Sequence, residues 1–217
     1  MSSNPTFPLD KPNLYLLGFM GTGKSVLGKR LAARLNYRFL DSDSAIEKKY
    51  SMPIKEIFSK YGEESFRKME REFIEAGHPE SGCVVACGGG LVCRDGMPEL
   101  VKSKGVSVVL FSTPEEIFER TSRNRDRPLL NCPNPLERIN TLLKERIPYY
   151  MSSGVAIAAD KNLKVTEARV LRIYKAKLRA LKKIQKAQKK NFQPQNKALE
   201  SVPVRAQKKQ ASAAIKG

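Results

Sequence analysis

Residues 18–25 of the 217-residue chain have the sequence Gly-Phe-Met-Gly-Thr-Gly-Lys-Ser. It satisfies the pattern G-x-x-x-x-G-K-[ST], in which glycines let backbone N–H groups surround phosphate oxygens where side chains would collide. The lysine of such a loop reaches the β- and γ-phosphates, and the serine hydroxyl can ligate Mg²⁺. The stretch therefore predicts a site for a nucleoside triphosphate with Mg²⁺.

The segments on both sides of this loop provide the context that the pattern requires. Residues 13–17 form a short apolar run that predicts a buried strand, and residues 24–35 carry apolar side chains at helical spacing. The loop thus joins a strand to a helix, which argues against an incidental Gly-rich turn. The expected nucleotide-binding residues are Gly21, Thr22, Gly23, Lys24, Ser25 and Val26.

Short apolar runs and helical segments alternate along the rest of the chain. This alternation predicts an α/β fold, a three-layer α/β/α sandwich around a central parallel sheet of about five strands, of the P-loop NTPase type. An acidic turn, Asp41-Ser42-Asp43, follows the second strand, and Thr113-Pro114 and Asn134-Pro135 carry helix-start signals. Further strands are expected at 38–40, 83–87, 106–111 and 155–159, and further helices at 53–58, 63–76 and from 165 onward.

The positive charge lies mostly at the C-terminal end. The net charge is +18, but residues 1–160 hold 23 Lys+Arg and 20 Asp+Glu, whereas residues 161–217 hold 17 and 2. We therefore expect a near-neutral domain followed by a basic extension that is helical at first and disordered over 191–217. Three interpretations of the extension stay open: a solvated segment without a defined role, weak binding to RNA or another polyanion, or a partner-helix or membrane surface.

Composition excludes several other classes of protein. No apolar run approaches the roughly 18–20 residues that span a bilayer, and residues 1–13 lack the features of a signal peptide. The four cysteines have irregular spacings and the chain has one histidine, which argues against a zinc site. We expect a cytoplasmic protein with reduced thiols and no membrane partner.

An Arg-rich segment late in the chain favours a small-molecule kinase over other P-loop enzymes. The GTPase sequence Asn-Lys-x-Asp is absent, and Pro128-Leu129-Leu130 follows a group of arginines. A lid at about 121–134 that closes over the phosphates is therefore expected, as in small-molecule kinases; a solvated charged helix face is the alternative. The arginines are Arg120, Arg123, Arg125 and Arg127.

Taken in order, these motifs and four others resemble the shikimate kinase family, within the nucleoside-monophosphate-kinase group of P-loop folds. The resemblance runs from about residue 14 to about residue 174 and implies a kinase domain over 14–180, an N-terminal lead over 1–13 and an extension over 181–217. The other segments are Ile54-x-x-Ile57-Phe58-x-x-x-Gly62-Glu63-x-x-Phe66-Arg67-x-x-Glu70, Gly88-Gly89-Gly90, Arg127-Pro128-Leu129-Leu130 and Arg146-x-Pro148-x-Tyr150.

The resemblance implies ATP-dependent phosphorylation of the 3-hydroxyl of shikimate by a monomer, on the chorismate route to aromatic amino acids. Lys24, Asp43 and Arg127 would be catalytic, and Ser25 and Asp41 would face Mg²⁺. Arg120 and Arg127 would contact the nucleotide. The substrate would be bound by Asp43, Arg67, Gly88, Gly89, Gly90 and Arg146, with Phe58, Phe66 and Pro128 as an apolar wall.

Several alternatives remain at this point. A kinase for another polyol acid, such as gluconate, and a nucleic-acid-binding protein that uses the P-loop as a switch are the rival functions. Asp41 could instead cap a helix, and Arg67 could pair only with Glu63 or Glu70 on its own helix. Cys87 stands where the family commonly has Thr or Ser, and we expect its thiol to be sensitive to alkylation.

Overall fold

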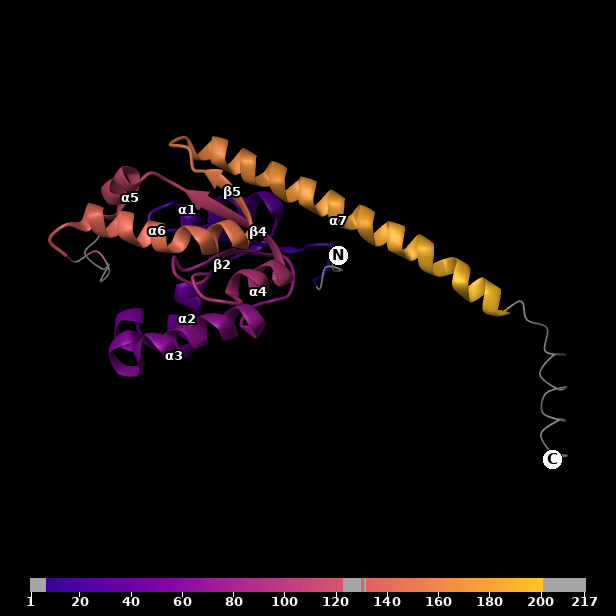
Figure 1. Cartoon of the computed structure of the whole chain (residues 1–217), viewed down its shortest axis with the longest axis horizontal. Helices are drawn as coiled ribbons and strands as arrows, with labels where there is room; N and C mark the ends of the chain where they lie inside the picture. Colours follow the sequence, from indigo (N-terminus) through magenta and orange to yellow (C-terminus); the bar gives the residue numbers. More distant parts are fainter. Residues whose placement is uncertain (1–6, 123–129, 131, 201–217) are drawn as a thin grey trace, which may run out of the picture. The chain divides into compact units, whose positions relative to one another are not determined.

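Five strands form one parallel sheet with helices on both of its faces (Figure 1). The structure, a computed structural model, describes residues 7–122, 130 and 132–200, with side chains up to residue 187. The strand order is β2-β3-β1-β4-β5, so the P-loop strand is central. The expected parallel sheet and fold class are confirmed. The strands are β1 (Asn13–Gly18), β2 (Arg38–Asp41), β3 (Cys83–Ala86), β4 (Gly105–Phe111) and β5 (Val155–Ala158).

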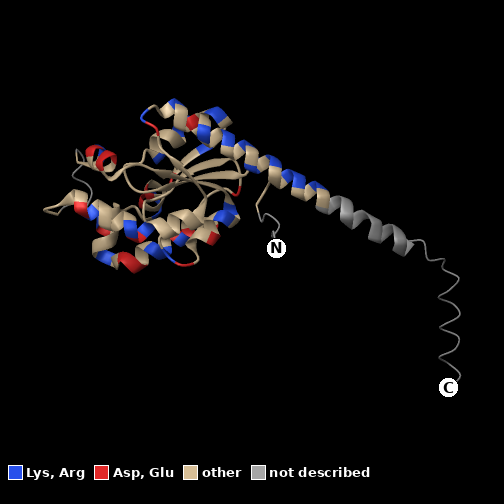
Figure 2. Ribbon diagram, turned by 45° about the horizontal axis from the view of Figure 1, so that its top comes forward, with Lys and Arg blue, Asp and Glu red and all other residues tan. Residues whose placement is uncertain are grey.

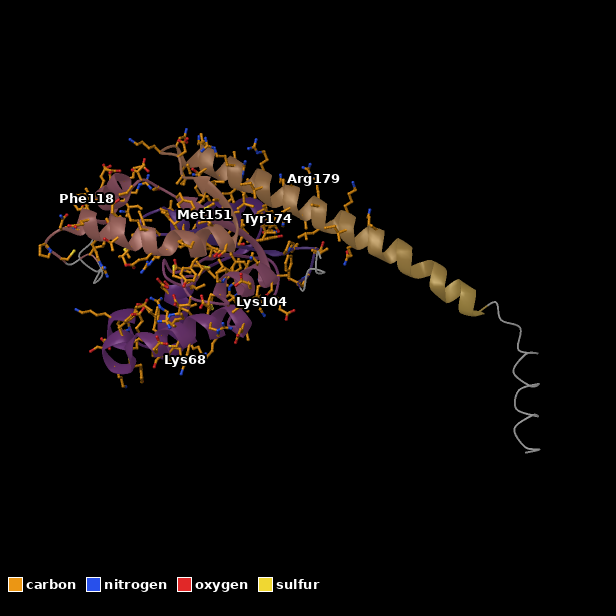
Figure 3. The ribbon with its side chains drawn as sticks, viewed as in Figure 1. Lys68, Lys104, Phe118, Met151, Tyr174 and Arg179 are labelled. Atoms are coloured by element: carbon orange, nitrogen blue, oxygen red, sulfur yellow. The ribbon has the colours of Figure 1, made fainter. Side chains whose placement is uncertain are left out.

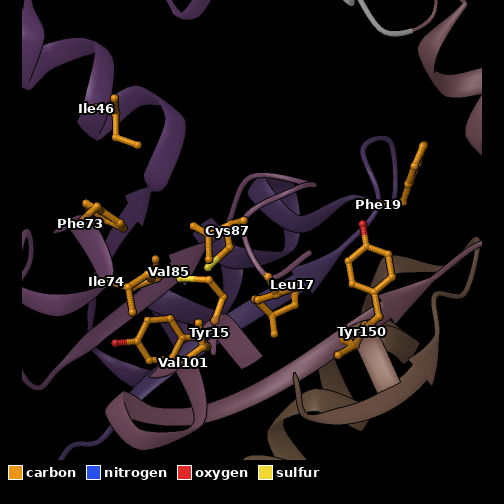
Figure 4. Packing of buried hydrophobic residues seen from close by; sticks show 14 of the residues in the cluster. Tyr15, Leu17, Phe19, Ile46, Phe73, Ile74, Val85, Cys87, Val101 and Tyr150 are labelled. Atoms are coloured by element: carbon orange, nitrogen blue, oxygen red, sulfur yellow. The ribbon is translucent and has the colours of Figure 1, made fainter. Parts of the chain in front are cut away.

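Side chains of β1 alternate between two hydrophobic clusters because successive residues of a strand point to opposite faces. Leu14 and Leu16 pack with α1 (Lys24–Leu35) and the first turns of α7 (Leu163–Glu200). Tyr15 and Leu17 pack with the helices on the other face, where Figure 4 shows Tyr15 beside Val101. Those helices are α2 (Ser42–Tyr50), α3 (Ile54–Ala76), α4 (Met97–Lys104), α5 (Pro114–Thr121) and α6 (Pro135–Ser153).

The segment expected to be an acidic turn is instead the end of β2 and the start of α2. The Asp41 side chain accepts hydrogen bonds from the backbone N–H groups of Asp43 (3.2 Å) and Ser44 (3.4 Å), and so caps the helix. The two helical segments expected after Pro53 are joined as α3, which is kinked at Gly62 with φ of 76°. Asp and Ser are common both in turns and at helix N-termini, so the sequence Asp41-Ser42-Asp43 does not by itself distinguish a turn from the start of α2.

Two helix starts follow the capping signals in the sequence. Thr113 Oγ1 accepts from the backbone N–H of Glu116 (3.3 Å) at the start of α5, and Asn134 Oδ1 accepts from that of Glu137 (3.4 Å) at the start of α6. A proline occupies the first turn of both helices, where its missing N–H costs nothing. These expectations are confirmed.

The chain divides into two compact units, Met1–Leu178 and Arg179–Gly217. Within the first unit Tyr174 of α7 is buried and its hydroxyl donates to the carbonyl of Pro12 (2.8 Å). The backbone of α7 is helical through Glu200, ten residues beyond the point at which disorder is expected to begin. Residues 201–217 lie outside the described residues. Among the described residues, no helix combines the length and apolar character needed to cross a membrane.

Candidate active site

The P-loop closes tightly between β1 and α1. Gly18 has φ of 124°, and a Cβ there would lie 2.2 Å from the carbonyl oxygen of Leu110, so only glycine fits. Lys24 is 9% exposed and its ammonium donates to the carbonyls of Gly18 (2.9 Å) and Phe19 (2.8 Å). The loop therefore holds its lysine at the carboxyl end of the central strand, where ligands bind in sheets of this kind.

Ser25 and Asp41 meet beside this loop. The Ser25 hydroxyl donates to Asp41 Oδ2 (2.8 Å), while Oδ1 of the same carboxylate caps α2. Asp41 therefore caps α2 through Oδ1, as the alternative for this residue predicts, and contacts Ser25 through Oδ2. A hydroxyl and a carboxylate are the hard oxygen donors that suit Mg²⁺ when phosphates complete its coordination, so these residues fit that ion.

A cavity of about 420 Å³ connects the loop with the triple glycine. Its volume is in the usual range for small-molecule sites. Thr22 is buried and its hydroxyl donates to the Phe19 carbonyl (2.8 Å), so this side chain supports the loop. The cavity is lined by Met20, Gly21, Gly23, Lys24, Ser25, Val26, Asp41, Asp43, Cys87, Gly88, Gly89 and Arg120.

Ser42 fixes the catalytic candidate Asp43 against the triple glycine. The buried Ser42 hydroxyl accepts from the backbone N–H of Gly88 (2.8 Å) and donates to Asp43 Oδ1 (3.3 Å). A Cβ on Gly88 would lie 2.5 Å from Asp43 Oδ1, so the approach requires glycine. Burial, and then the charge of Asp41, raises the pKa of Asp43, while Lys24 opposes this shift. A carboxylate with a raised pKa is better suited to accept a proton near neutral pH.

Arg67 is held between two carboxylates of its own helix. Its guanidinium lies 2.8 Å from Glu63 and 2.7 Å from Glu70, and the Glu70 side chain is 2% exposed. Burial raises the pKa of Glu70 to about 7, against the opposing charge of Arg67. The guanidinium also reaches the triple glycine, because a Cβ on Gly90 would lie 2.8 Å from Arg67 Nη1. Arg67 therefore pairs with Glu63 and Glu70, as the alternative predicts, and at the same time lies beside Gly90.

Arg146 and Tyr150 of α6 meet at the carbonyl of Gly89. The Arg146 guanidinium donates to this oxygen (3.3 Å) and lies 5.3 Å from the ring centroid of Phe19. The hydroxyl of Tyr150 donates to the same oxygen (2.5 Å), and its side chain is buried. Arg67, Gly90 and Arg146 are not part of the cavity lining; they adjoin the cavity through Gly88 and Gly89.

The structure describes some of the remaining predicted site residues. Arg120 donates to the Gly21 carbonyl (3.2 Å), which places it on the nucleotide side of the loop. The rings of Phe58 and Phe66 lie 4.8 Å apart. Arg123, Arg125, Arg127 and Pro128, and with them most of the expected lid, lie outside the described residues.

The structure contradicts the expectation for Cys87 and adds three residues to the site. Cys87 is 1% exposed and burial raises the pKa of its thiol, so a reactive thiolate is disfavoured, contrary to the expected sensitivity to alkylation. Ser42, Glu70 and Tyr150 make the contacts above but were given no role from the sequence. The one sequence signal for these three residues is their position within the quoted motifs. Their roles depend on contacts and burial that form only in the folded chain.

Comparisons with known proteins agree on one family. A family model described as shikimate kinase matches residues 20–187. The chain is 45% identical over 148 residues to a shikimate kinase of Thermodesulfovibrio yellowstonii, covering 68% of this chain and 86% of that protein. It is 39% identical to a shikimate kinase of Caldanaerobacter subterraneus over 163 residues, 75% of this chain and 95% of that protein.

A solved structure shows the same similarity in three dimensions. The shikimate kinase of Acinetobacter baumannii in complex with shikimate superposes with a TM-score of 0.71 at 34% sequence identity. The match covers 77% of this chain and 95% of that one. Sequence and fold are thus similar to the same group of enzymes over most of the chain.

Proposed function

The chain belongs to the shikimate kinase family, and from that premise we propose that it transfers the γ-phosphoryl group of ATP to the 3-hydroxyl of shikimate. The products are shikimate 3-phosphate and ADP, within the biosynthesis of aromatic amino acids. The observation that carries the proposal is that Lys24, Asp43 and Gly89 all line the same cavity. It gives a phosphate-binding group and a proton acceptor access to the same small volume.

The nucleotide would lie along the P-loop. Backbone N–H groups of the loop and the ammonium of Lys24 would bind the phosphates, with Arg120 beside Gly21 at the edge of the cavity. Ser25 and Asp41 would hold Mg²⁺, which when bound supplies positive charge to the β- and γ-phosphate oxygens. Arg127 of the expected lid would add a further positive charge during transfer.

The carboxylate of shikimate would lie at the side of the triple glycine. Arg67 and Arg146, from α3 and α6, both reach this segment, and guanidinium groups bind carboxylates through paired hydrogen bonds. The 3-hydroxyl would then point toward Asp43, which borders Gly88. This arrangement selects a substrate with a carboxylate at one end and a hydroxyl at the other.

Transfer requires one bond to form and one to break. The oxygen of the 3-hydroxyl bonds to the γ-phosphorus as the bond from that phosphorus to the bridging oxygen of ADP breaks. Asp43 accepts the hydroxyl proton, and its raised pKa favours this role. Lys24 stabilises the negative charge on the phosphoryl oxygens, and a closed lid would exclude water that could accept the phosphoryl group instead.

An ADP-release assay with shikimate, quinate and gluconate as acceptors tests the proposal. We expect rapid ADP release with shikimate and much slower release with the other two acids. Turnover on gluconate alone would contradict the choice of substrate, and ATP binding without any transfer would favour the P-loop switch. A monomeric state and a cytoplasmic location stay predictions.

A further inference from the structure

The part of α7 at residues 179–187 carries four cations and no carboxylate. All four side chains are exposed, and within the described part of the chain no carboxylate forms an ion pair with any of them. Figure 2 shows blue without red along this part of the helix, and Arg179 is labelled in Figure 3. We call this surface the basic face; it consists of Arg179, Lys182, Lys183 and Lys186.

Helical spacing places these cations side by side. Relative to Arg179 the other three stand at i+3, i+4 and i+7, which are neighbouring positions on a helix surface. Each like-charge pair at this spacing destabilises a helix by about 0.2–0.5 kcal/mol. Because the helix itself gains nothing from this arrangement, a bound polyanion is the partner that would stabilise it.

The basic face also leads into a segment that lies beyond the family match. The family match ends at residue 187. Residues 188–217 add seven Lys+Arg against one Asp+Glu. The basic face thus lies at the end of the family match, the chain stays basic beyond it, and the groups that border the active-site cavity all lie before residue 179.

We propose that the basic face binds the phosphate backbone of RNA without sequence preference. Cations repeated along one face over about 10 Å of helix match a ligand that repeats its negative charge. Residues 179–187 contain no aromatic side chain on which bases could stack, so contact with the backbone is the mode that fits.

An anionic membrane is the less suitable polyanion. Helices that lie in a membrane interface need a broad apolar face with large side chains. Within residues 179–187 only Leu181 and Ile184 are large and apolar, and both are partly buried in the structure. The face therefore offers charge but little apolar surface, as expected for a ligand held by its phosphates.

The test uses the full-length chain and two variants that each lose four positive charges. In the first, Arg179, Lys182, Lys183 and Lys186 are replaced by Gln, which has a similar helix propensity. In the matched control, four exposed lysines of the first unit, Lys48, Lys55, Lys68 and Lys144, are replaced by Gln. Fluorescence anisotropy with a labelled mixed-sequence single-stranded RNA gives the Kd over a series of salt concentrations.

We expect the wild type to bind with a Kd of roughly 10⁻⁴–10⁻⁶ M at physiological salt. The basic-face variant should bind at least about tenfold more weakly, with a slope of log K against log salt less negative by roughly 3, since each phosphate contact contributes about 0.7. The control variant should keep the wild-type slope. Shikimate turnover should be unchanged in both variants, which checks that they fold.

Three results would overturn the proposal. They are equal RNA affinity of the basic-face variant and the wild type, no RNA binding by the wild type at low salt, and binding to phosphatidylserine-containing vesicles without binding to RNA. None of them bears on the kinase reaction, so the two proposals can fail separately.

Discussion

Glu70 Oε2 lies 2.7 Å from Arg67 Nη1, and among the described residues this is the least exposed ion pair beside the active-site cavity. The Glu70 side chain is 2% exposed and that of Arg67 is 14% exposed. Burial of a carboxyl group disfavours its charged form, which is why the pKa of Glu70 rises to about 7 in spite of its partner. The group that orients the proposed carboxylate-binding arginine therefore titrates near neutral pH.

Shikimate binding should weaken as the pH rises above about 7. A substrate carboxylate at Arg67 adds a negative charge near Glu70 and raises its pKa further, so binding takes up a proton once free Glu70 is ionised. We expect the KM for shikimate to be flat below this pH and to rise by up to about tenfold above it, as for a shift of one pKa unit. Steady-state kinetics across this range provide the measurement.

The Glu70→Gln variant is the control for this pH dependence. It keeps a hydrogen-bond acceptor beside Arg67 but cannot ionise, so its KM profile should be flatter. In the folded state the pKa of Glu70 is raised from 4.5 to about 7. The contribution of Glu70 to the free energy of unfolding is therefore complete below pH 4.5 and is lost as the pH rises to about 7. Urea unfolding should show this fall in the free energy of unfolding for the wild type and not for the variant. If both proteins have the same pH profile, Glu70 is not the group responsible for the pH dependence.

Replacing Ser25 with Ala should raise the Mg²⁺ concentration needed for half-maximal activity. The variant loses a hydroxyl donor and the hydrogen bond that orients Asp41 at 2.8 Å. Changes to groups that hold or orient metal ligands commonly cost about 10–100-fold in affinity. Titration with Mg²⁺ at saturating ATP measures the effect. Ser44→Ala, beside the same carboxylate but with no hydroxyl contact to it, should behave as the wild type.

Asp43→Asn should lower kcat by about 10²–10⁴-fold, the usual contribution of a general base. The amide keeps the shape of the side chain next to Ser42 but cannot accept the substrate proton. ATP binding, measured by calorimetry, should persist because the P-loop is intact. Near-normal turnover in this variant would remove Asp43 from its proposed role.

Tyr150→Phe should raise the KM for shikimate about fivefold and leave the KM for ATP nearly unchanged. The lost hydroxyl donates to the Gly89 carbonyl together with the Arg146 guanidinium and, more weakly at 3.8 Å, the Cys93 thiol; a net hydrogen bond is worth about 1 kcal/mol. Tyr149→Phe is the matched control, since its exposed hydroxyl donates to Asp95 at 3.5 Å and not, within the described residues, to the Gly89 carbonyl. Equal changes in both KM values would point to a general loss of structure instead.

Glu167→Gln should destabilise the domain by about 1–2 kcal/mol. Glu167 on α7 is buried and lies 2.7 Å from Arg30 and 3.2 Å from Arg34 on α1, but both arginines are exposed, which limits the loss. The exposed pair of Arg71 and Glu75 offers a comparison, and Glu75→Gln should cost less than about 0.5 kcal/mol. Urea unfolding of the two variants gives both values.

Local sequence signals predicted the parts of this protein that depend on local interactions. The P-loop, the five apolar strands and the capped starts of α5 and α6 each follow from residues within a few positions of one another. The order of motifs also identified the family and so nominated the site residues. The exception was α2, because the Asp41 side chain that starts this helix has the same local pattern as a turn.

The tertiary structure decided how these parts meet. The strand order and the contacts of Ser42 with Gly88 and of Tyr150 with Gly89 join positions 46 and 61 residues apart, and no local pattern specifies such distances. The pKa of Glu70 likewise depends on burial, which exists only once α3 packs on the sheet. Sequence motifs thus identify the groups of the proposed site, whereas packing sets their neighbours and their pKa values, because desolvation and long-range contacts arise only in the folded chain.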